Sequence, residues 1–216
     1  ACPPPSRSRR RSRRRRRPPP PSPRPPPTSA PPPWTLDGHA LVCLVRTPRG
    51  PGVLAFARYT ASPVGPYDEV LFVPGVRPPF HVEAIRVSSV DSMGWGRRNW
   101  GIPKHLALFD WQEQGTCFAV HVRDPGTGEV FALLEGEGRG RDYTVATGWV
   151  PAALRRFDQA YEGRHYRFSP SGRARGRAAR VTAVHVGGAG FPEITGVHAA
   201  AQVTRLRLDL PVPTVG

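Results

Sequence analysis

A single lysine stands out among the residues of this chain that could do chemistry. The 216 residues contain 31 lysines and arginines, and Lys104 is the only lysine. Arginine keeps its proton in proteins, so it cannot replace lysine where a neutral, nucleophilic amine is required. The composition therefore points to Lys104 as a nucleophile. The alternative is a surface cation that happens to have remained a lysine.

The residues around Lys104 favour a buried amine. Burial disfavours the ammonium form, and lowering a lysine pKa from about 10.4 to near neutrality requires roughly 4 kcal/mol, which desolvation can supply. Pro103 also restricts Ile102 to an extended backbone and so limits how Lys104 is presented. The apolar residues that crowd this stretch are Trp95, Trp100, Ile102, Pro103, Leu106, Leu108 and Phe109.

The elements that must position this lysine are predicted to be short strands. From Trp34 onward, apolar runs alternate with Gly and Pro, a pattern typical of an antiparallel barrel or sandwich. In 117–123 and 205–210 apolar residues occupy every second position, which predicts one buried and one exposed face. Residues 124–128 predict a hairpin turn. The predicted strands are 39–46, 53–59, 69–73, 81–88, 107–112, 117–123, 129–134, 181–186 and 203–210.

One or two helices and two loops complete the predicted fold. A helix is expected over 151–162, where a proline suits the first helical position and a glycine follows the last. A shorter helix is expected near Asp91, although the glycines that follow would weaken it. Residues 171–180 are interpreted as a basic loop. Residues 187–190 are glycine-rich but lack the Gly-Lys-Ser/Thr ending of a P-loop, so we interpret them as a loop too.

Residues 1–33 are predicted to be a disordered Arg/Pro-rich tail. They contain ten arginines, fourteen prolines and no acidic residue, too little apolar surface to offset the entropy of ordering. They carry ten of the fifteen net positive charges, which leaves +5 for residues 34–216. That remainder is long enough for one substantial core. The predicted domain is therefore 34–216, either whole or incomplete at its C-terminus.

The tail bears on partners and on location. Its arginine run, Arg13 to Arg17, could hold a polyanion through counterion release. No aromatic residues interleave with the arginines, so nucleic-acid binding is not expected apart from this basic tail. The tail also has the composition of a transit peptide, so we expect a cytoplasmic protein, or an organellar one if it is a transit peptide. No apolar run reaches the ~20 residues needed for a membrane span.

Neither a metal nor a cofactor is expected. Cys2, Cys43 and Cys117 are odd in number and widely spaced, which argues against a disulfide framework and a zinc site. We interpret Cys43 and Cys117 as ordinary strand residues. The histidines show no H-E-x-x-H or other ligand spacing.

Two segments resemble the signature stretches of acetoacetate decarboxylase-like proteins. They are SPVGPYDEV at 62–70 and GRRNWGIPK at 96–104, and the similarity covers most of 34–135. The resemblance implies a mainly β fold, a closed, cone-like antiparallel barrel with one or two short helices and an apolar pocket. It also implies that Lys104 is the Schiff-base lysine and that Glu69 is a pocket carboxylate.

The function implied by this resemblance is that of a cofactor-independent carboxy-lyase. Neutral Lys104 would attack the carbonyl of a small keto acid or ketone, and the iminium would accept electrons as carbon dioxide leaves. Acetoacetate-like substrates are the leading candidates. Glu69 would orient the amine or carry protons, or else be a strand-start carboxylate that faces water. The candidates for substrate binding are Tyr67, Arg97, Trp100 and His105.

Departures from the family pattern leave other functions open. The family's second lysine is His105 here, and adjacent residues of an extended segment point to opposite faces. Gly38-His39 and Leu54-Ala55 stand where a pocket arginine and a second glutamate are expected. Arg97 and Arg98 are the candidate replacements for that arginine.

Two alternatives to an enzyme follow from these departures. Plant neoxanthin-deficient proteins resemble this chain in the segment 65–69 but lack the lysine. A non-catalytic protein of the same fold that binds an apolar ligand is therefore the first alternative. The second is a passive β scaffold for a functional arginine tail. Members of the family assemble into oligomers, so a homo-oligomer is an open expectation.

Overall fold

The computed structural model describes residues 29–216, which form two β-sheets. The strands of the larger sheet are β1 (Trp34–Thr47), β2 (Gly50–Ala61), β3 (Tyr67–Pro74), β4 (Ala84–Val87), β5 (His105–Leu106), β6 (Leu108–Gln114), β7 (Cys117–Arg123), β8 (Val130–Ala146), β11 (Ser171–Val186) and β12 (Gly196–Leu210). The smaller sheet contains β9 (Phe157–Tyr161), β10 (Arg164–Phe168) and β13 (Thr214–Val215). The helices are α1 (Val90–Trp100) and the 3-10 turn η1 (Ala152–Arg155).

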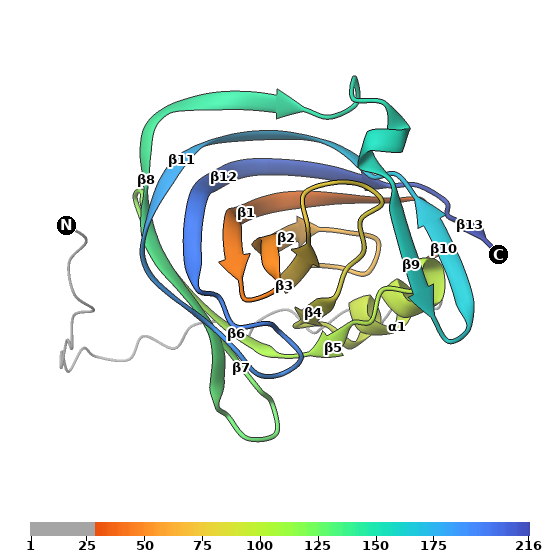
Figure 1. The fold of residues 1–216 in the computed structure, drawn as a ribbon, viewed down its shortest axis with the longest axis horizontal. Coiled ribbons are helices and arrows are strands. Elements are labelled where there is room, and N and C mark those ends of the chain that lie inside the picture. Colours follow the sequence, from red (N-terminus) through yellow and green to blue (C-terminus); the bar gives the residue numbers. More distant parts are fainter. Residues whose placement is uncertain (1–28) are drawn as a thin grey trace, which may run out of the picture.

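The ten-stranded sheet curves until it is nearly closed into a barrel (Figure 1). Its hydrogen-bonded order is β5-β4-β3-β2-β1-β12-β11-β8-β7-β6, and every neighbouring pair except β4 and β5 is antiparallel. The two edge strands, β5 and β6, are separated in the chain by Ala107 alone. The sheet therefore begins and ends at one place in the sequence, next to the predicted nucleophile. The mainly β, barrel-like architecture predicted from the sequence is confirmed.

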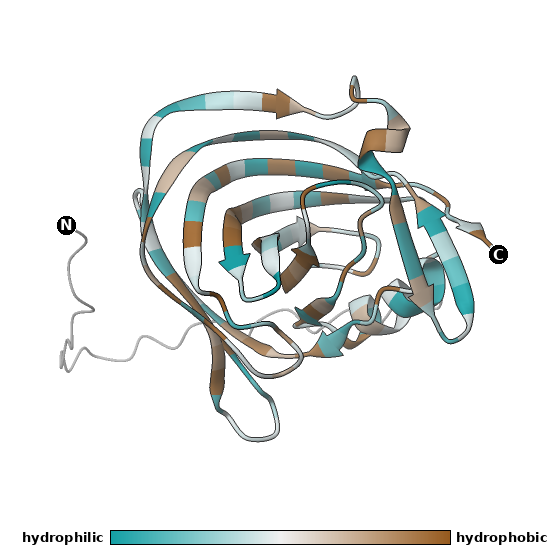
Figure 2. Cartoon of the chain, in the orientation of Figure 1, coloured by the Kyte–Doolittle hydropathy of each residue, from teal (hydrophilic) through white to brown (hydrophobic). Residues whose placement is uncertain are grey.

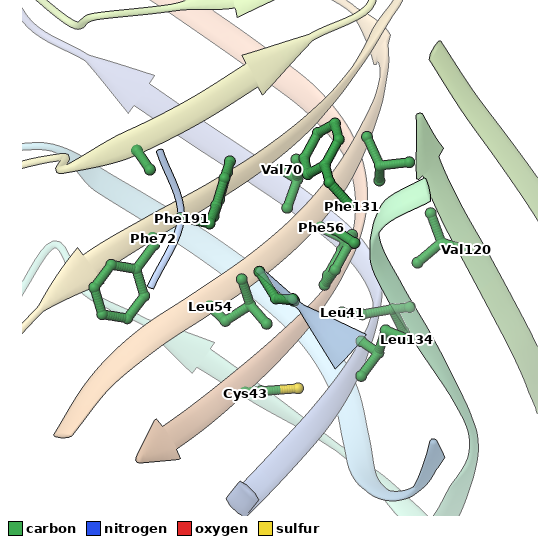
Figure 3. Packing of buried hydrophobic residues seen from close by; sticks show 14 of the residues in the cluster. Leu41, Cys43, Leu54, Phe56, Val70, Phe72, Val120, Phe131, Leu134 and Phe191 are labelled. Atoms are coloured by element: carbon green, nitrogen blue, oxygen red, sulfur yellow. The ribbon is translucent and has the colours of Figure 1, made fainter. Parts of the chain in front are cut away.

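Both faces of strands β1–β3 are buried, which divides the interior into two cores. Leu54 and Phe56 of β2 lie in the first core with residues of β7 and β8 such as Val120 and Leu134 (Figure 3). Ala57 and Tyr59 of the same strand lie in the second core. Alternation along a strand places neighbouring residues on opposite faces. Figure 2 shows the same alternation of hydrophobic and hydrophilic residues along the long outer strands.

All nine predicted strand segments overlap strands of the structure, and 124–128 is the predicted turn between β7 and β8. The short helix expected near Asp91 is α1. Residues 187–190 lie outside strands and helices apart from one isolated bridge. None of the helices in residues 29–216 has the length and apolar character that a membrane span requires.

The helix predicted over 151–162 is wrong. Only one 3-10 turn forms there, and the chain then enters β9, which pairs with β10. The two residues between the paired positions Tyr161 and Arg164 both have positive φ, 50° at Glu162 and 75° at Gly163. Positive φ at both central residues defines the tight I′ turn that joins twisted strands. The glycine predicted to end a helix instead makes a hairpin.

The basic loop predicted over 171–180 is also wrong, because these residues begin β11. Arginines alternate with glycine and alanine here, which is the period-two pattern of a strand. Glycine and alanine are too small to give the alternate positions a clear hydrophobic signal. The small residues are required by packing. A Cβ at Gly176 would lie 2.4 Å from the backbone oxygen of Gln202, and one at Gly172 would lie 2.6 Å from that of Arg207.

Most of the predicted tail, residues 1–28, lies outside the described residues. Ala30, at its C-terminal end, is buried. Its carbonyl accepts hydrogen bonds from Nε1 of Trp34 at 2.9 Å and from Nδ2 of Asn99 at 2.8 Å. Packing therefore extends into the last residues of the segment predicted to be the tail.

A chain that begins at Trp34 should be less stable than one that begins at Ser29. Removing Ala30 deprives two buried donors of their acceptor, and an unsatisfied buried donor costs about 1–3 kcal/mol. We expect the free energy of unfolding to fall by that amount, and the urea midpoint to fall with it. Equal midpoints for the two chains would contradict a structural role for Ala30.

Candidate active site

A cavity of about 200 Å³ lies on the second-core side of β1–β3, and Lys104 reaches into it. Alternate residues of β3 contribute to its wall, because residues two apart along a strand share a face. The polar part of the lining consists of two tyrosines, one glutamate and one lysine. The lining residues are Leu36, Tyr59, Tyr67, Glu69, Leu71, Val73, Val82, Ile85, Ile102, Lys104, Phe157, Phe168, Pro170, Leu208 and Leu210.

Lys104 and Glu69 form a buried ion pair at one end of this apolar cavity. Nζ of Lys104 donates to Oε2 of Glu69 at 2.8 Å, and each residue is only 4% exposed. Nζ also donates to Oγ of Ser92 at 3.1 Å. The exposure excludes the alternative in which Glu69 faces water, and it excludes a surface lysine.

Helix α1 supplies the surface on which the Lys104 side chain lies. Ser92 and Gly96 are four residues apart and therefore lie on one face of the helix. A Cβ at Gly96 would come within 2.7 and 2.8 Å of Cδ and Cε of Lys104. Glycine at position 96 is thus needed for the Lys104 side chain to cross the helix. Ser92, one turn earlier, accepts a hydrogen bond from Nζ of that side chain.

The end of α1 directs the lysine back toward the helix. The backbone of Gly101 is left-handed, with φ 63°, and its N–H bonds to the carbonyl of Arg97 at 2.9 Å. Such a cap suits glycine, which has no Cβ to clash. Nε of Arg97 in turn donates to the carbonyl of Lys104 at 2.8 Å. The helix and the loop that follows it therefore hold both the backbone and the side chain of the lysine.

The pKa of Lys104 does not fall, contrary to the expectation from its apolar sequence neighbours. Burial alone would lower it, but the charge of Glu69, then Tyr67, and the hydrogen bond to Glu69 oppose burial and leave the pKa above its ordinary value. An opposite charge in hydrogen-bond contact favours the ammonium form. Lys104 is therefore held as a cation near neutral pH, and it must give up its proton before it can act as a nucleophile.

Two tyrosines complete the polar end of the cavity. The hydroxyl of Tyr59 donates to Oε1 of Glu69 at 3.4 Å, and burial followed by the Glu69 charge raises the pKa of Tyr59 well above its usual range. The ring of Tyr67 lies under Nζ of Lys104, 5.1 Å from the ring centroid. Burial raises the pKa of Tyr67 to about 12, although Lys104 acts in the opposite direction. No hydrogen bond of good geometry reaches its buried hydroxyl among the described residues, although Ser92 and Lys104 lie close enough to act on its pKa.

The structure brings together three of the six predicted site residues, Lys104, Glu69 and Tyr67. The other three do not line the cavity. Trp100 is fully buried, donates from Nε1 to the carbonyl of Pro211, and packs edge-on against Trp34. These three placements assign Trp100 to the second core.

The remaining two predicted residues lie on the outer side of the lysine loop. His105 is exposed, and its Nδ1 lies 3.4 Å from Nη2 of Arg97. Burial, followed by Arg86 and Arg97, lowers the pKa of His105. It points away from Lys104, as adjacent residues of an extended segment do.

Within residues 29–216, no arginine lines the cavity in place of the pocket cation that the family resemblance implies. Arg97 bonds to the Lys104 carbonyl, and Arg98 is exposed with its guanidinium over the ring of Trp95. Gly38, in the region expected to supply the arginine, has no room for a side chain, because a Cβ there would lie 2.1 Å from the carbonyl oxygen of Arg58. Among the cavity-lining residues, Lys104 is the only cation.

Sequence reasoning missed Ser92, Gly96 and Tyr59 as site residues. Their signals were present but weak. Ser92 and Gly96 have helical i, i+4 spacing just before the lysine, but a glycine within a helix predicts a weaker helix and does not by itself indicate a side chain lying across it. Tyr59 shares a strand with the hydrophobic core, where an aromatic residue is expected to pack. Within residues 29–216 no group of three or more His, Cys, Asp or Glu side chains could hold a metal ion.

Comparisons with known proteins agree with this geometry. No protein-family model and no curated protein matches the sequence. The crystal structure of acetoacetate decarboxylase from Legionella pneumophila subsp. pneumophila str. Philadelphia 1 matches with a TM-score of 0.66 at 13% identity, over 86% of this chain and 88% of that one. The enduracididine biosynthesis enzyme MppR, complexed with the condensation product of pyruvate and imidazole 4-carboxaldehyde, matches with a TM-score of 0.60 at 14% identity, over 87% and 90%.

The chain has the acetoacetate decarboxylase-like fold. At these identities the similarity shows the fold and does not extend to the reaction. Within this acetoacetate decarboxylase-like fold, the feature that favours chemistry is the pair formed by Lys104 and Glu69.

Replacing Glu69 with glutamine should lower the free energy of unfolding by about 3 kcal/mol at pH 7, because it leaves a buried ammonium without its counter-charge. Asp68→Asn is the matched control. Asp68 pairs on the opposite face with Arg58, whose side chain is 36% exposed, so the loss should stay below about 1 kcal/mol. The double variant Lys104→Met/Glu69→Gln should recover most of the loss, since no buried charge is left unpaired. Equal losses for Glu69→Gln and Asp68→Asn in urea unfolding would show that Lys104 does not depend on Glu69 for its counter-charge.

The two glycines of α1 offer a second matched pair. Gly96→Ala should displace Lys104 from Glu69 and lower stability by about 1–3 kcal/mol through overpacking. Gly94 is exposed and has no atom within 4 Å of an added Cβ, so Gly94→Ala should raise stability by about 1 kcal/mol. Thermal unfolding would measure both changes. Stabilisation by both substitutions would show that the lysine does not need the space at position 96.

Proposed function

We propose that this protein is an enzyme that forms a Schiff base between Lys104 and a keto compound, and that decarboxylation of a β-keto acid is the first reaction to test. The observation that carries the proposal is the buried amine, 2.8 Å from the Glu69 carboxylate at the end of an apolar cavity. A lysine placed beside a proton acceptor and shielded from water is suited to attack a carbonyl. Surface ion pairs do not need such shielding.

The first step is proton transfer within the pair. Lys104 gives a proton from Nζ to Oε2 of Glu69, which produces a neutral amine and a carboxylic acid. Entry of an apolar substrate removes remaining water, and a low dielectric favours the neutral pair over two charges. The 2.8 Å contact is within the distance required for direct transfer.

The second step forms the iminium. The lone pair of Nζ bonds to the carbonyl carbon, the C=O π electrons move to oxygen, and the oxygen takes the proton held by Glu69. The nitrogen then returns its second proton to the Glu69 carboxylate. Glu69 donates this proton to the hydroxyl of the carbinolamine, the C–O bond breaks as water leaves, and the nitrogen lone pair forms the C=N bond of the iminium. Glu69 serves here as proton donor and acceptor, positioned by Tyr59 through Oε1.

The third step breaks the carbon–carbon bond of a β-keto acid. The bonding electrons flow into the iminium, carbon dioxide leaves, and an enamine remains. Apolar walls favour this step because they solvate the neutral product better than the carboxylate. Protonation of the enamine carbon and addition of water then release the ketone and restore Lys104.

Tyr67 is the remaining polar group that faces this chemistry. Its buried hydroxyl makes no well-formed hydrogen bond among the described residues, so it can still bond to a molecule bound in the cavity. In the proposal it donates a hydrogen bond to the oxygen of the bound carbonyl compound. Its pKa of about 12 means that it remains a donor at neutral pH.

A second candidate function is binding of an apolar ligand without catalysis. The raised pKa of Lys104 and the lack of a second cation in the lining favour it, because a β-keto acid would have only the lysine to balance its charge. On this candidate the lysine stays paired with Glu69 and never meets a carbonyl.

Borohydride reduction distinguishes the two functions. The full chain is incubated with acetoacetate and sodium borohydride, and adducts are located by peptide mass spectrometry. We expect an irreversible adduct at Lys104, since hydride converts the iminium to a stable secondary amine. Lys104→Arg keeps the charge and should abolish the adduct. No adduct under conditions that label a known acetoacetate decarboxylase would support the ligand-binding function.

The pH dependence of this trapping tests the role of Glu69. Glu69 keeps the pKa of Lys104 above its ordinary value, so the fraction of neutral amine, and with it the trapping rate, should still be rising at pH 9–10. Glu69→Gln removes the largest influence that opposes burial, so the lysine pKa should fall and the profile should shift to lower pH by at least ~1 unit. An unchanged profile would show that Glu69 does not control the amine.

A further inference from the structure

A second cavity, of about 420 Å³, adjoins the one that contains Lys104. Residues of β3, β9 and β12 contribute to both linings, together with Pro170. Because the same side chains line both cavities, the two spaces lie next to each other. The residues that line both cavities are Leu71, Val73, Phe157, Pro170 and Leu208.

The wall of the second cavity is mostly apolar, and two of its polar side chains, Thr147 and Arg155, already have partners within the chain. The hydroxyl of Thr147 accepts from the N–H of Gly172 at 2.9 Å. Arg155 donates from Nε to the carbonyl of Val150 at 2.9 Å, and from Nη1 to the carbonyls of Ser169 and Pro170. Groups that are satisfied in this way offer little to a polar ligand. The cavity is suited to hydrocarbon.

The far end of the second cavity is open to solvent through apolar residues. Leu154 of η1 is 57% exposed and Val145 of β8 is 46% exposed, and both line the cavity. Arg173, the other cation of the lining, is also exposed. Large apolar side chains around the mouth of an apolar cavity mark an entry for a ligand of the same character.

The two cavities also differ in volume. Pockets for small organic ligands usually occupy about 300–1,000 Å³. The cavity at Lys104, about 200 Å³, is below that range, whereas the adjoining one, about 420 Å³, lies within it. A ligand that reacted at Lys104 and used only the first cavity would leave the larger apolar surface unused.

We infer that the substrate is an elongated keto compound whose carbonyl meets Lys104 and whose hydrocarbon chain extends past Phe157 into the second cavity. The inference rests on the proposed function for the reaction at the lysine, but the chain-binding part stands separately. Each methylene buried in the second cavity strengthens binding by a factor of about four. Tail length is therefore the main determinant of specificity.

The test compares acetylacetone with the same β-diketone carrying a linear tail of about eight carbons, on the full chain. Each condenses with an amine, with loss of water, to a stable conjugated enaminone, so trapping needs no borohydride and is followed by near-ultraviolet absorbance. Half-maximal trapping at Lys104 should require at least tenfold less of the long compound. Ala174→Phe fills the second cavity, because Ala174 lines it and does not line the first. It should remove the preference for the long compound and leave trapping of acetylacetone unchanged.

Three controls separate the effect of filling the cavity from other effects of the substitution. Ala178→Phe places the same side chain at another position of the same strand, outside both linings, and should preserve the preference. If Ala174→Phe fails to fold by circular dichroism, Val145→Phe at the mouth replaces it. A secondary alcohol with the same tail, which cannot form an imine, reports binding of the chain by calorimetry.

The outcomes separate the inference from the proposed function. Trapping of acetylacetone with no preference for the long compound overturns the inference and leaves the Schiff-base function standing. No trapping at all, with tight alcohol binding that Ala174→Phe weakens at least tenfold, overturns the enzyme and retains the chain-binding cavity. Trapping with a preference that persists in Ala174→Phe overturns the placement of the tail.

Discussion

The structure is organised around two opposite charges held out of water. Lys104 and Glu69 are 2.8 Å apart, and each is 4% exposed. Desolvation of such a pair costs several kcal/mol per ion, and only close contact with further hydrogen bonds offsets it. Ser92 and Tyr59 supply those bonds, one to each partner. A well-packed apolar pair would serve stability as well, so retention of the charges points to chemistry or ligand binding.

The fold meets this requirement by burying both faces of β1–β3. A sheet with one wet face would leave Glu69 in solvent, but here the second core covers that face. Helix α1 and the small sheet lie on one side of the curved ten-stranded sheet (Figure 1). The chain returns from α1 through Gly101 to β5, so one short segment closes the sheet and delivers the lysine. Substitutions in α1 should therefore affect closure and site together.

Local sequence patterns predicted individual strands and turns well, but they did not predict which distant segments pair with one another. Alternating residues revealed β7, and the turn over 124–128 was visible from its composition. The helix expected over 151–162 failed because pairing with β10 overrides local propensity. Lys104 and Glu69 could be named from residue type and resemblance. Their contact was one of two alternatives that the resemblance left open, and local patterns could not decide between them because the two residues are 35 positions apart in the chain. Nor could the raised lysine pKa be predicted, since it reflects a balance between burial and two neighbours, Glu69 first and Tyr67 second.

A decarboxylase for a small keto acid would combine a buried amine with a second cation that holds the substrate carboxylate. The cavity formed by residues 29–216 has the first of these and lacks the second. The amine and its proton acceptor are in place, but the surrounding wall is apolar, and Gly38 has no space for a side chain. A site without a second cation gives small anionic substrates little additional affinity. Substrates with a hydrocarbon chain gain affinity with each methylene that is buried. In this fold, the groups near the lysine would determine the reaction, while the walls shared with the second cavity would determine which carbonyl compound reaches it. Divergence of substrate can then proceed through the walls, without change at Lys104.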